Sequence, residues 1–167
     1  MIACFRMTSE LLPDAYALLN DFLSEDEYYL DSSSAYGHRG NSALRTALEM
    51  FVVRPELGFV WLAYKGNVPV GVCVVSYAIS TSVGAVVAKL DDVFIGTEEQ
   101  GKGMGSELLE ELKAELRKQN IVRIDTSVHL RNGRARQFYI RNGFKTLNEE
   151  RLSCVLAPES DRAAPQR

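Results

Sequence analysis

The sequence predicts a single α/β domain built on a mixed, mostly antiparallel, twisted sheet that is flanked by helices. Its 167 residues are enough for one domain with a hydrophobic core and too few for two. Apolar residues recur at helical spacing before Pro55, and from Phe59 the spacing becomes that of strands. A strand, a glycine-rich turn and a helix follow one another at 89–117. We expect the domain to cover residues 1–157, and residues 158–167, with two prolines and no apolar pattern, to form a disordered tail.

Capping and turn signals divide the N-terminal half. Thr8 or Ser9 precedes an apolar-periodic run with Pro13 in its first turn, which predicts a helix. Serines at 32–34 and glycines at 37 and 40 indicate a loop before a second helix. Lys65-Gly66-Asn67 is a tight turn between two strand-like runs. In chain order we expect a strand at 2–6, helices from 8 or 9 to 22 and at 42–52, and strands at 59–64, 68–77 and 85–95.

The C-terminal half begins with apolar residues at helical spacing over 106–117. Asn132 is a good N-cap for a later helix, which Asn142-Gly143 ends. A polar turn at 148–150 separates two short apolar runs. We therefore expect a helix from Ser106, a buried strand at 121–128, a helix at 132–141, and final strands at 145–147 and 151–156.

Composition and charge exclude several classes of protein. The net charge of −3 argues against a nucleic-acid partner held by charge. No apolar stretch reaches membrane-spanning length, and the first residues have no signal-peptide pattern, so we expect a cytoplasmic protein without membrane contact. Cys4, Cys73 and Cys154 lie far apart in apolar runs, so we interpret them as reduced core residues, and with two histidines to help, no metal site is expected.

The glycine-rich turn spans Gln100, Gly101, Lys102, Gly103, Met104 and Gly105. A turn between a strand and a helix directs free backbone N–H groups at the positive end of the helix dipole, where a phosphate binds well. The glycines remove the Cβ atoms that would keep an anion away, and Lys102 adds a charge at the rim. The spacing matches neither the P-loop nor the dinucleotide fingerprint. An ordinary strand-to-helix turn remains the alternative interpretation.

A second motif lies at 132–144. On the predicted helix, Ala135, Phe138 and Tyr139 fall three and four residues apart along one face, with Asn132 at its head. The alternative interpretation is a plain amphipathic helix whose aromatic residues pack in the core. We adopt this interpretation for Phe138.

The two motifs together resemble the GNAT family of N-acetyltransferases. Gln-x-x-Gly-x-Gly at 100–105 is similar to the family's acetyl-CoA diphosphate loop, and Asn-x-x-Ala-x-x-Phe-Tyr with a following Gly-Phe is similar to its second motif. The resemblance implies acetyl-CoA as cosubstrate and a cofactor helix that carries Tyr139. It also implies arginines at 134 or 136 near the CoA phosphates and allows a homodimer. The implied cofactor-binding residues are Val93, Phe94, Ile95, Gln100, Gly101, Lys102, Gly103, Met104, Gly105, Ser106, Asn132, Ala135 and Tyr139.

Leu90-Asp91-Asp92 is most similar to the small-amine, spermidine/spermine-type branch, which has glutamate where this chain has Asp91. Acetyl transfer needs a base, because an amine at neutral pH is mostly protonated. Period two places Asp91 with Val93 on one strand face and Asp92 with Leu90 and Phe94 on the other, unless a bulge shifts the register. We favour Asp91 as the base and Tyr139 as the acid for the leaving thiol, with Asp92 or a water chain as alternatives for the base.

The acceptor site in this family is formed by the first two helices and their loop. Glu25, Asp26 and Tyr28, with Asp92, are the expected substrate-binding residues, because carboxylates and aromatic rings hold cations. A small-molecule amine, such as a polyamine or an aminoglycoside, is therefore the expected substrate. A protein N-terminus or lysine is the second choice, and a CoA-binding sensor without transfer is a different class. In the alternative interpretation these acidic residues only solvate a loop, and they then give no information about the acceptor.

Overall fold

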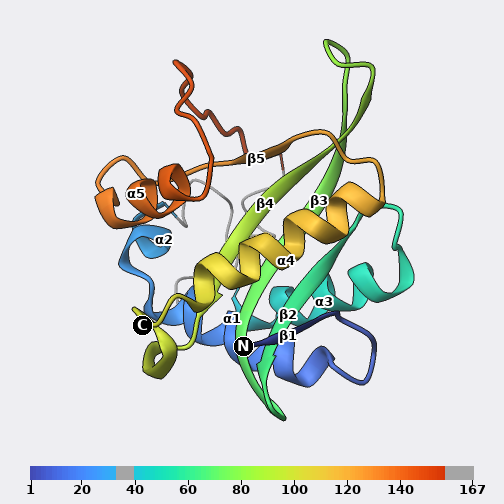
Figure 1. Ribbon diagram of the computed structural model, residues 1–167, viewed down its shortest axis with the longest axis vertical. Coiled ribbons are helices and arrows are strands. Elements are labelled where there is room, and N and C mark those ends of the chain that lie inside the picture. The colour runs from blue at the N-terminus through green and yellow to red at the C-terminus, as the bar shows by residue number, and fades with distance from the viewer. Residues whose placement is uncertain (33–39, 157–167) are drawn as a thin grey trace.

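The computed structural model describes residues 1–32 and 40–156 (Figure 1). Within these residues the chain forms one five-stranded sheet in the order β1-β2-β3-β4-β5. Neighbouring strands from β1 to β4 are antiparallel, and β4 and β5 are parallel. The predicted mixed, mostly antiparallel sheet flanked by helices is confirmed. The elements are β1 (Ala3–Arg6), α1 (Leu12–Glu25), α2 (Glu27–Ser32), α3 (Asn41–Val53), β2 (Gly58–Lys65), β3 (Val68–Ser80), β4 (Ala85–Ile95), a 3-10 helix (Thr97–Glu99), α4 (Met104–Lys118), β5 (Ile124–Thr126) and α5 (Gly133–Arg141).

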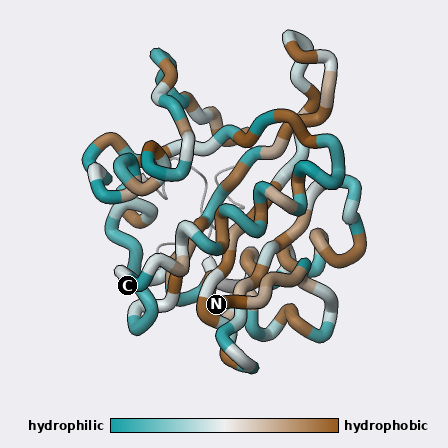
Figure 2. The backbone as a smooth tube through the Cα atoms, viewed as in Figure 1, coloured by the Kyte–Doolittle hydropathy of each residue, from teal (hydrophilic) through white to brown (hydrophobic). Residues whose placement is uncertain are grey.

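Each face of the sheet has its own hydrophobic core. Alternate residues of β2 separate them: Val60 and Leu62 pack under α1 and α3, while Trp61 packs on the face that α4 and α5 cover. Along α4, Leu108 and Leu112 are fully buried, and Figure 2 shows the helix alternating between hydrophobic and hydrophilic residues. Each such leucine contributes about 2 kcal/mol through burial, so α4 is fixed on the sheet by its apolar face.

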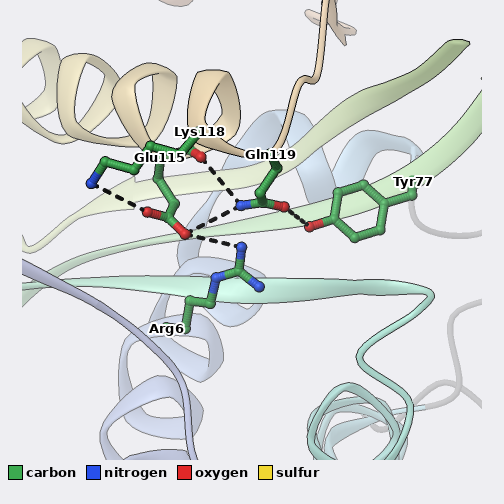
Figure 3. Close-up of polar contacts among 5 residues, drawn as sticks. All are labelled: Arg6, Tyr77, Glu115, Lys118 and Gln119. Carbon is green, nitrogen blue, oxygen red and sulfur yellow. Dashed lines mark hydrogen bonds and ion pairs between the residues drawn. The ribbon is translucent and has the colours of Figure 1, made fainter.

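Polar contacts fix the C-terminal end of α4 (Figure 3). The Tyr77 hydroxyl on β3 donates to the side chain of Gln119 at 2.6 Å, and Arg6 on β1 pairs with Glu115 at 3.0 Å. Gln119 also donates to Glu115 at 3.2 Å, and Lys118 lies 3.7 Å from Glu115. These contacts join α4 to two strands at the end opposite its N-terminus, so they help to set where that N-terminus lies.

A β-bulge interrupts β4. Val72 is opposite Phe94 and Val74 is opposite Asp91, so Asp92 and Val93 together face Cys73. Asp92 has a φ of 50°, in the left-handed region. The bulge moves Val93 to the α4 face, where Leu90 lies, and Phe94 to the α1 face. The expectation that Leu90 and Phe94 share a face was therefore wrong, because the register shift that the alternation could not reveal occurs between them.

β5 is much shorter than the strand expected at 121–128. Only Ile124–Thr126 pairs, from Ala88 opposite Ile124 to Leu90 opposite Thr126. The Thr126 hydroxyl donates to the Leu90 carbonyl at 2.9 Å and closes the pairing. Beyond Leu90 the two strands part, so no other strand of the described residues pairs with the β5-facing edge of β4 over residues 91–95.

The final strands expected at 145–147 and 151–156 are absent from the described chain, which has no strand after β5. Leu147 and Leu152 are 68% and 85% exposed, so their apolar side chains do not pack on the sheet. Cys154 is exposed as well, against the expectation of a core residue, whereas Cys73 is buried. Short apolar runs identify segments that could form a strand, but they do not show whether a sheet edge is available to pair with.

The N-terminal helices also differ from the prediction. Helix α1 begins at Leu12, after a turn in which the Leu11 N–H bonds to the Thr8 carbonyl, so neither Thr8 nor Ser9 caps it. The acidic stretch after α1 forms the short helix α2, which periodicity did not predict. His38 and the tail at 158–167 lie outside the described residues. In the described ranges, no helix combines the length and the apolar character needed to cross a bilayer.

Candidate active site

The glycine-rich loop joins β4 to α4, and its glycines serve two different purposes. Gly101 and Gly103 have φ values of 77° and 83°, which L-residues adopt with strain, and a Cβ on either would meet no atom within 4 Å. Gly105 packs against the Phe138 ring, which would lie 3.1 Å from an added Cβ. The first two glycines therefore leave open space in front of the loop, and the third lets α4 and α5 approach each other.

The N-terminus of α4 forms a cradle for an anion. Gly103 occupies the cap position, so no side chain caps the helix. The first N–H groups of a helix have no intrahelical acceptor, and the helix dipole favours negative charge there. The Met104 side chain is only 8% exposed, and Ser106 Oγ accepts from Asn142 at 3.1 Å. Hence Met104 and Ser106 present backbone N–H groups here, and the open cradle fits the diphosphate of a nucleotide cosubstrate.

Two polar side chains of the loop already have protein partners. Gln100 donates to the Ile95 carbonyl at 2.9 Å, which ties the loop to the end of β4. Lys102 lies 3.3 Å from Glu99, which also pairs with Lys65 at 3.2 Å. The hydrogen bond from Lys65, then Lys102, lowers the pKa of Glu99. The positive charge of Lys102 is thus shared with a carboxylate.

Helix α5 begins with the predicted cap, since Asn132 Oδ1 accepts from the Ala135 N–H at 3.0 Å. Tyr139 is 9% exposed and contacts the rings of Phe138 and Phe144. Burial raises the pKa of Tyr139 to about 12, although a hydrogen bond with Thr126 acts in the opposite direction. The phenol is therefore protonated at neutral pH, and the raised pKa makes it a weaker acid than an ordinary tyrosine. Phe138 packs in the core, as expected.

The two carboxylates of the bulge differ in their surroundings. Burial, then the neighbouring charge of Asp91, raises the pKa of Asp92 to about 6. Arg151 and Lys89 act in the opposite direction. Asp91 is 31% exposed, and its Oδ2 lies 3.7 Å from Lys89 Nζ. Both carboxylates are near enough to Tyr139 to raise its pKa. The structure thus brings the two candidate bases and the candidate acid together where β4 and β5 part.

The side chains after the bulge point to both sides of the sheet. Val93 and Ile95 pack on the α4 face, and Phe94 packs on the α1 face, where its ring centroid lies 5.9 Å from that of Phe22. The edge of β4 at 91–95 leaves backbone groups available to an extended ligand that pairs like a strand. Of the three residues that follow the bulge, Phe94 therefore turns its side chain to the face that α1 and α3 cover, opposite to Val93 and Ile95.

Three of the expected acceptor residues, Glu25, Asp26 and Tyr28, lie at the junction of α1 and α2, whereas the fourth, Asp92, lies in β4. Glu25 is exposed, and Asp26 Oδ1 accepts from the Tyr29 N–H at 2.7 Å, so Asp26 caps the following turn. The Tyr28 ring packs on His129 with centroids 5.2 Å apart. Sequence reasoning found no partner for His129 and did not identify Thr126, because neither contact leaves a local pattern. The described residues contain no group of three or more His, Cys, Asp or Glu side chains placed to hold a metal ion.

The fold and the site together are those of a group-transfer enzyme. A family model described as an acetyltransferase (GNAT) domain matches residues 56–146, more than half of the chain. The protein therefore belongs to the GNAT family and is an acetyl-CoA-dependent N-acetyltransferase. No curated protein matches the chain in sequence.

Solved structures share the fold at low identity. An integron cassette protein from the mobile metagenome of Cole Harbour Salt Marsh is 22% identical, with a TM-score of 0.75, over 95% of this chain and 93% of that one. AAC(6')-Iy, solved with a CoA-S-monomethyl-acetylneamine bisubstrate analogue, is 14% identical, with a TM-score of 0.69, over 92% and 99%. A ribosomal-protein-alanine N-acetyltransferase from Brucella melitensis is 10% identical, with a TM-score of 0.72, over 94% and 100%.

Proposed function

We propose that the protein acetylates a primary amine of a small cationic molecule, such as a polyamine or an aminoglycoside, by direct attack in a ternary complex. The observation that carries this proposal is a separation of charge across the place where β4 and β5 part, between α1–α2 on one side and α5 on the other. Between Met7 and His38 the sequence has seven carboxylates and no lysine or arginine. Helix α5, on the opposite side, has three arginines and no carboxylate. Such a field attracts a cation on the α1–α2 side and anionic phosphates on the α5 side.

Several of the seven carboxylates have structural partners. Asp14 accepts from the Tyr64 hydroxyl at 2.7 Å, Asp26 caps a turn, and Asp31 pairs with His129. Glu25 and Glu27 are exposed at the junction of α1 and α2. These two glutamates, with the aromatic ring of Tyr28, are the groups that we assign to binding the acceptor cation. Leu90-Asp91-Asp92, which is similar to the small-amine branch, supports the same assignment.

Bound acetyl-CoA supplies an activated acetyl group and a thiol leaving group. The loop at 101–106 would hold its diphosphate through backbone N–H groups, and the edge of β4 at 91–95 would hold its extended arm. Asp92 accepts the proton of the acceptor ammonium. We prefer it to Asp91, the first choice from sequence, because a pKa of about 6 leaves Asp92 ionised yet basic at neutral pH. As the amine nitrogen bonds to the acetyl carbon and the C–S bond breaks, Tyr139 would protonate the departing sulfur. The second proton of the nitrogen would pass to solvent, which would also take the proton from Asp92 and reprotonate Tyr139.

The experiment is an assay of thiol release from acetyl-CoA against polyamines, aminoglycosides, amino acids and short peptides. Turnover on a free diamine or aminoglycoside, reduced in Asp92→Asn and in Tyr139→Phe, supports the proposal. Glu49→Gln on α3 is the matched control, because it removes an exposed carboxylate that pairs with Arg45, outside the site. Turnover on peptides alone would move the acceptor to proteins. Tight CoA binding with no acetylated acceptor in the panel would contradict the proposed small-amine substrate and favour a CoA-binding sensor.

A further inference from the structure

Helix α2 is joined to the loop that leads into α5. His129 Nε2 lies 2.7 Å from Asp31 Oδ2, and an Arg131 guanidinium nitrogen lies 3.3 Å from Asp31 Oδ1. The Tyr28 ring packs on the imidazole at 5.2 Å. The His129 side chain is only 18% exposed, although its partner Asp31 is 49% exposed. We refer to the pair Asp31 and His129 as the clasp.

Hydrogen bonds assign the tautomer of the imidazole. The Arg131 backbone N–H donates to His129 Nδ1 at 3.2 Å, so Nδ1 is an acceptor. The ring proton of the neutral imidazole therefore lies on Nε2, which donates to Asp31. That hydrogen bond, then the charge of Arg131, lowers the pKa of Asp31, so the carboxylate is ionised at neutral pH. In this tautomer both ring nitrogens of His129 have a hydrogen-bond partner: Nε2 donates to Asp31, and Nδ1 accepts from the Arg131 N–H.

The clasp connects the two sides of the opening between β4 and β5. His129 follows the Thr126 contact that ends the strand pairing by three residues, and it precedes the Asn132 cap of α5 by three residues. At the other end, α2 continues from α1, where Phe22 contacts Phe94 just after the bulge. Figure 1 shows α2 near the segment that leads from β5 into α5, about a hundred residues further along the chain, and the Tyr28 ring contacts His129 in that segment. The clasp therefore fixes the position of α2, which carries proposed acceptor residues, relative to α5, which carries proposed cofactor residues.

We infer that Asp31 and His129 are positioning residues that hold α2 in place as a wall of the acceptor site. This inference rests on the proposed function. A six-residue helix has little stability of its own, because helix nucleation is costly. Its orientation therefore depends on tertiary contacts. Glu27 and Tyr28, assigned above to the acceptor, lie on the same helix, so a change in its orientation moves the acceptor groups and leaves the α4 cradle unchanged.

The test compares His129→Ala with His129→Gln, whose amide N–H lies near the position of Nε2. Because hydrogen bonds to charged groups contribute more than neutral ones, we expect His129→Ala to raise the KM for the amine about tenfold. The kcat and the KM for acetyl-CoA should change less than about threefold. His129→Gln should restore most of the amine KM. Glu49→Ala, which removes an exposed ion pair on α3, is the control.

Hydrogen exchange of α2 amides gives a readout that needs no turnover. Exchange should become faster in His129→Ala and return toward the parent value in His129→Gln. Unchanged exchange in the alanine variant would overturn the clasp. Faster exchange with an unchanged amine KM would overturn positioning alone, and an equal rise of both KM values would indicate general loosening instead. A protein that acetylates no amine overturns the proposed function, while the exchange result still decides the clasp.

Discussion

Replacing Asp92 with asparagine should stabilise the fold at neutral pH while it removes the proposed proton acceptor. The folded-state pKa of Asp92 is about 6, against an ordinary value of 3.8, chiefly because of burial. Between these values the native state binds more protons than the unfolded state, so the free energy of unfolding falls as the pH rises. Each pKa unit corresponds to about 1.4 kcal/mol, so the loss is about 2 to 3 kcal/mol once the pH exceeds 6. Asparagine keeps the shape, carries no charge and tolerates the φ of 50°.

Urea unfolding of the parent and the variant at pH 4 and pH 7.5 measures this effect. The two proteins should be similar in stability at pH 4, where the carboxyl is mostly neutral in the folded state. At pH 7.5 the variant should be more stable by about 2 kcal/mol. The parent's kcat/KM should also rise with pH through about 6. A stability difference that is the same at both pH values would refute the argument, because the ionised form would then carry no penalty.

Three further changes follow from the site. Tyr139→Phe should lower kcat about 10²-fold through loss of the acid, with little change in the KM for acetyl-CoA, and steady-state kinetics measure both. Gly105→Ala should cost about 1 kcal/mol in urea unfolding, because its Cβ would lie 3.1 Å from the Phe138 ring. Gly133→Ala is its counterpart, since a Cβ there meets no atom within 4 Å, and it should stabilise by about 0.5 kcal/mol. Equal effects of the two alanines would contradict the packing argument.

Local signals were enough to predict much of the fold. The strand expected at 85–95 is β4, which runs from Ala85 to Ile95, and Asn132 caps α5. Both depend on residues within a few positions of each other. The Gly84 N–H bonds to the Ser80 carbonyl in the turn before β4, and the Ala135 N–H bonds to Asn132 at the start of α5. The glycine loop was recognisable for the same reason, because a turn that needs positive φ selects glycine locally.

The remaining features depend on contacts between distant residues. The bulge arises from register between β3 and β4, so alternation alone misplaced Phe94. Leu147 and Leu152 have strand-like neighbours but no partner edge. The raised pKa of Asp92 comes from burial, and the bond between His129 and Asp31 joins residues 98 positions apart. None of these leaves a pattern within a window of sequence.

The short parallel pairing of β4 with β5 also has a consequence for how the chain folds. Strands β2, β3 and β4 are joined by tight turns, so they can form early from neighbouring segments. Strand β5 must wait for α4 to cross the sheet, and it then gains a contact of three residues. We expect β5 and α5 to dock last and to detach first, which makes them the least stable part of the fold. Acetyl-CoA bound against both α4 and α5 would hold β5 and α5 on the rest of the domain. The resistance of the protein to proteolysis should therefore increase with the concentration of acetyl-CoA.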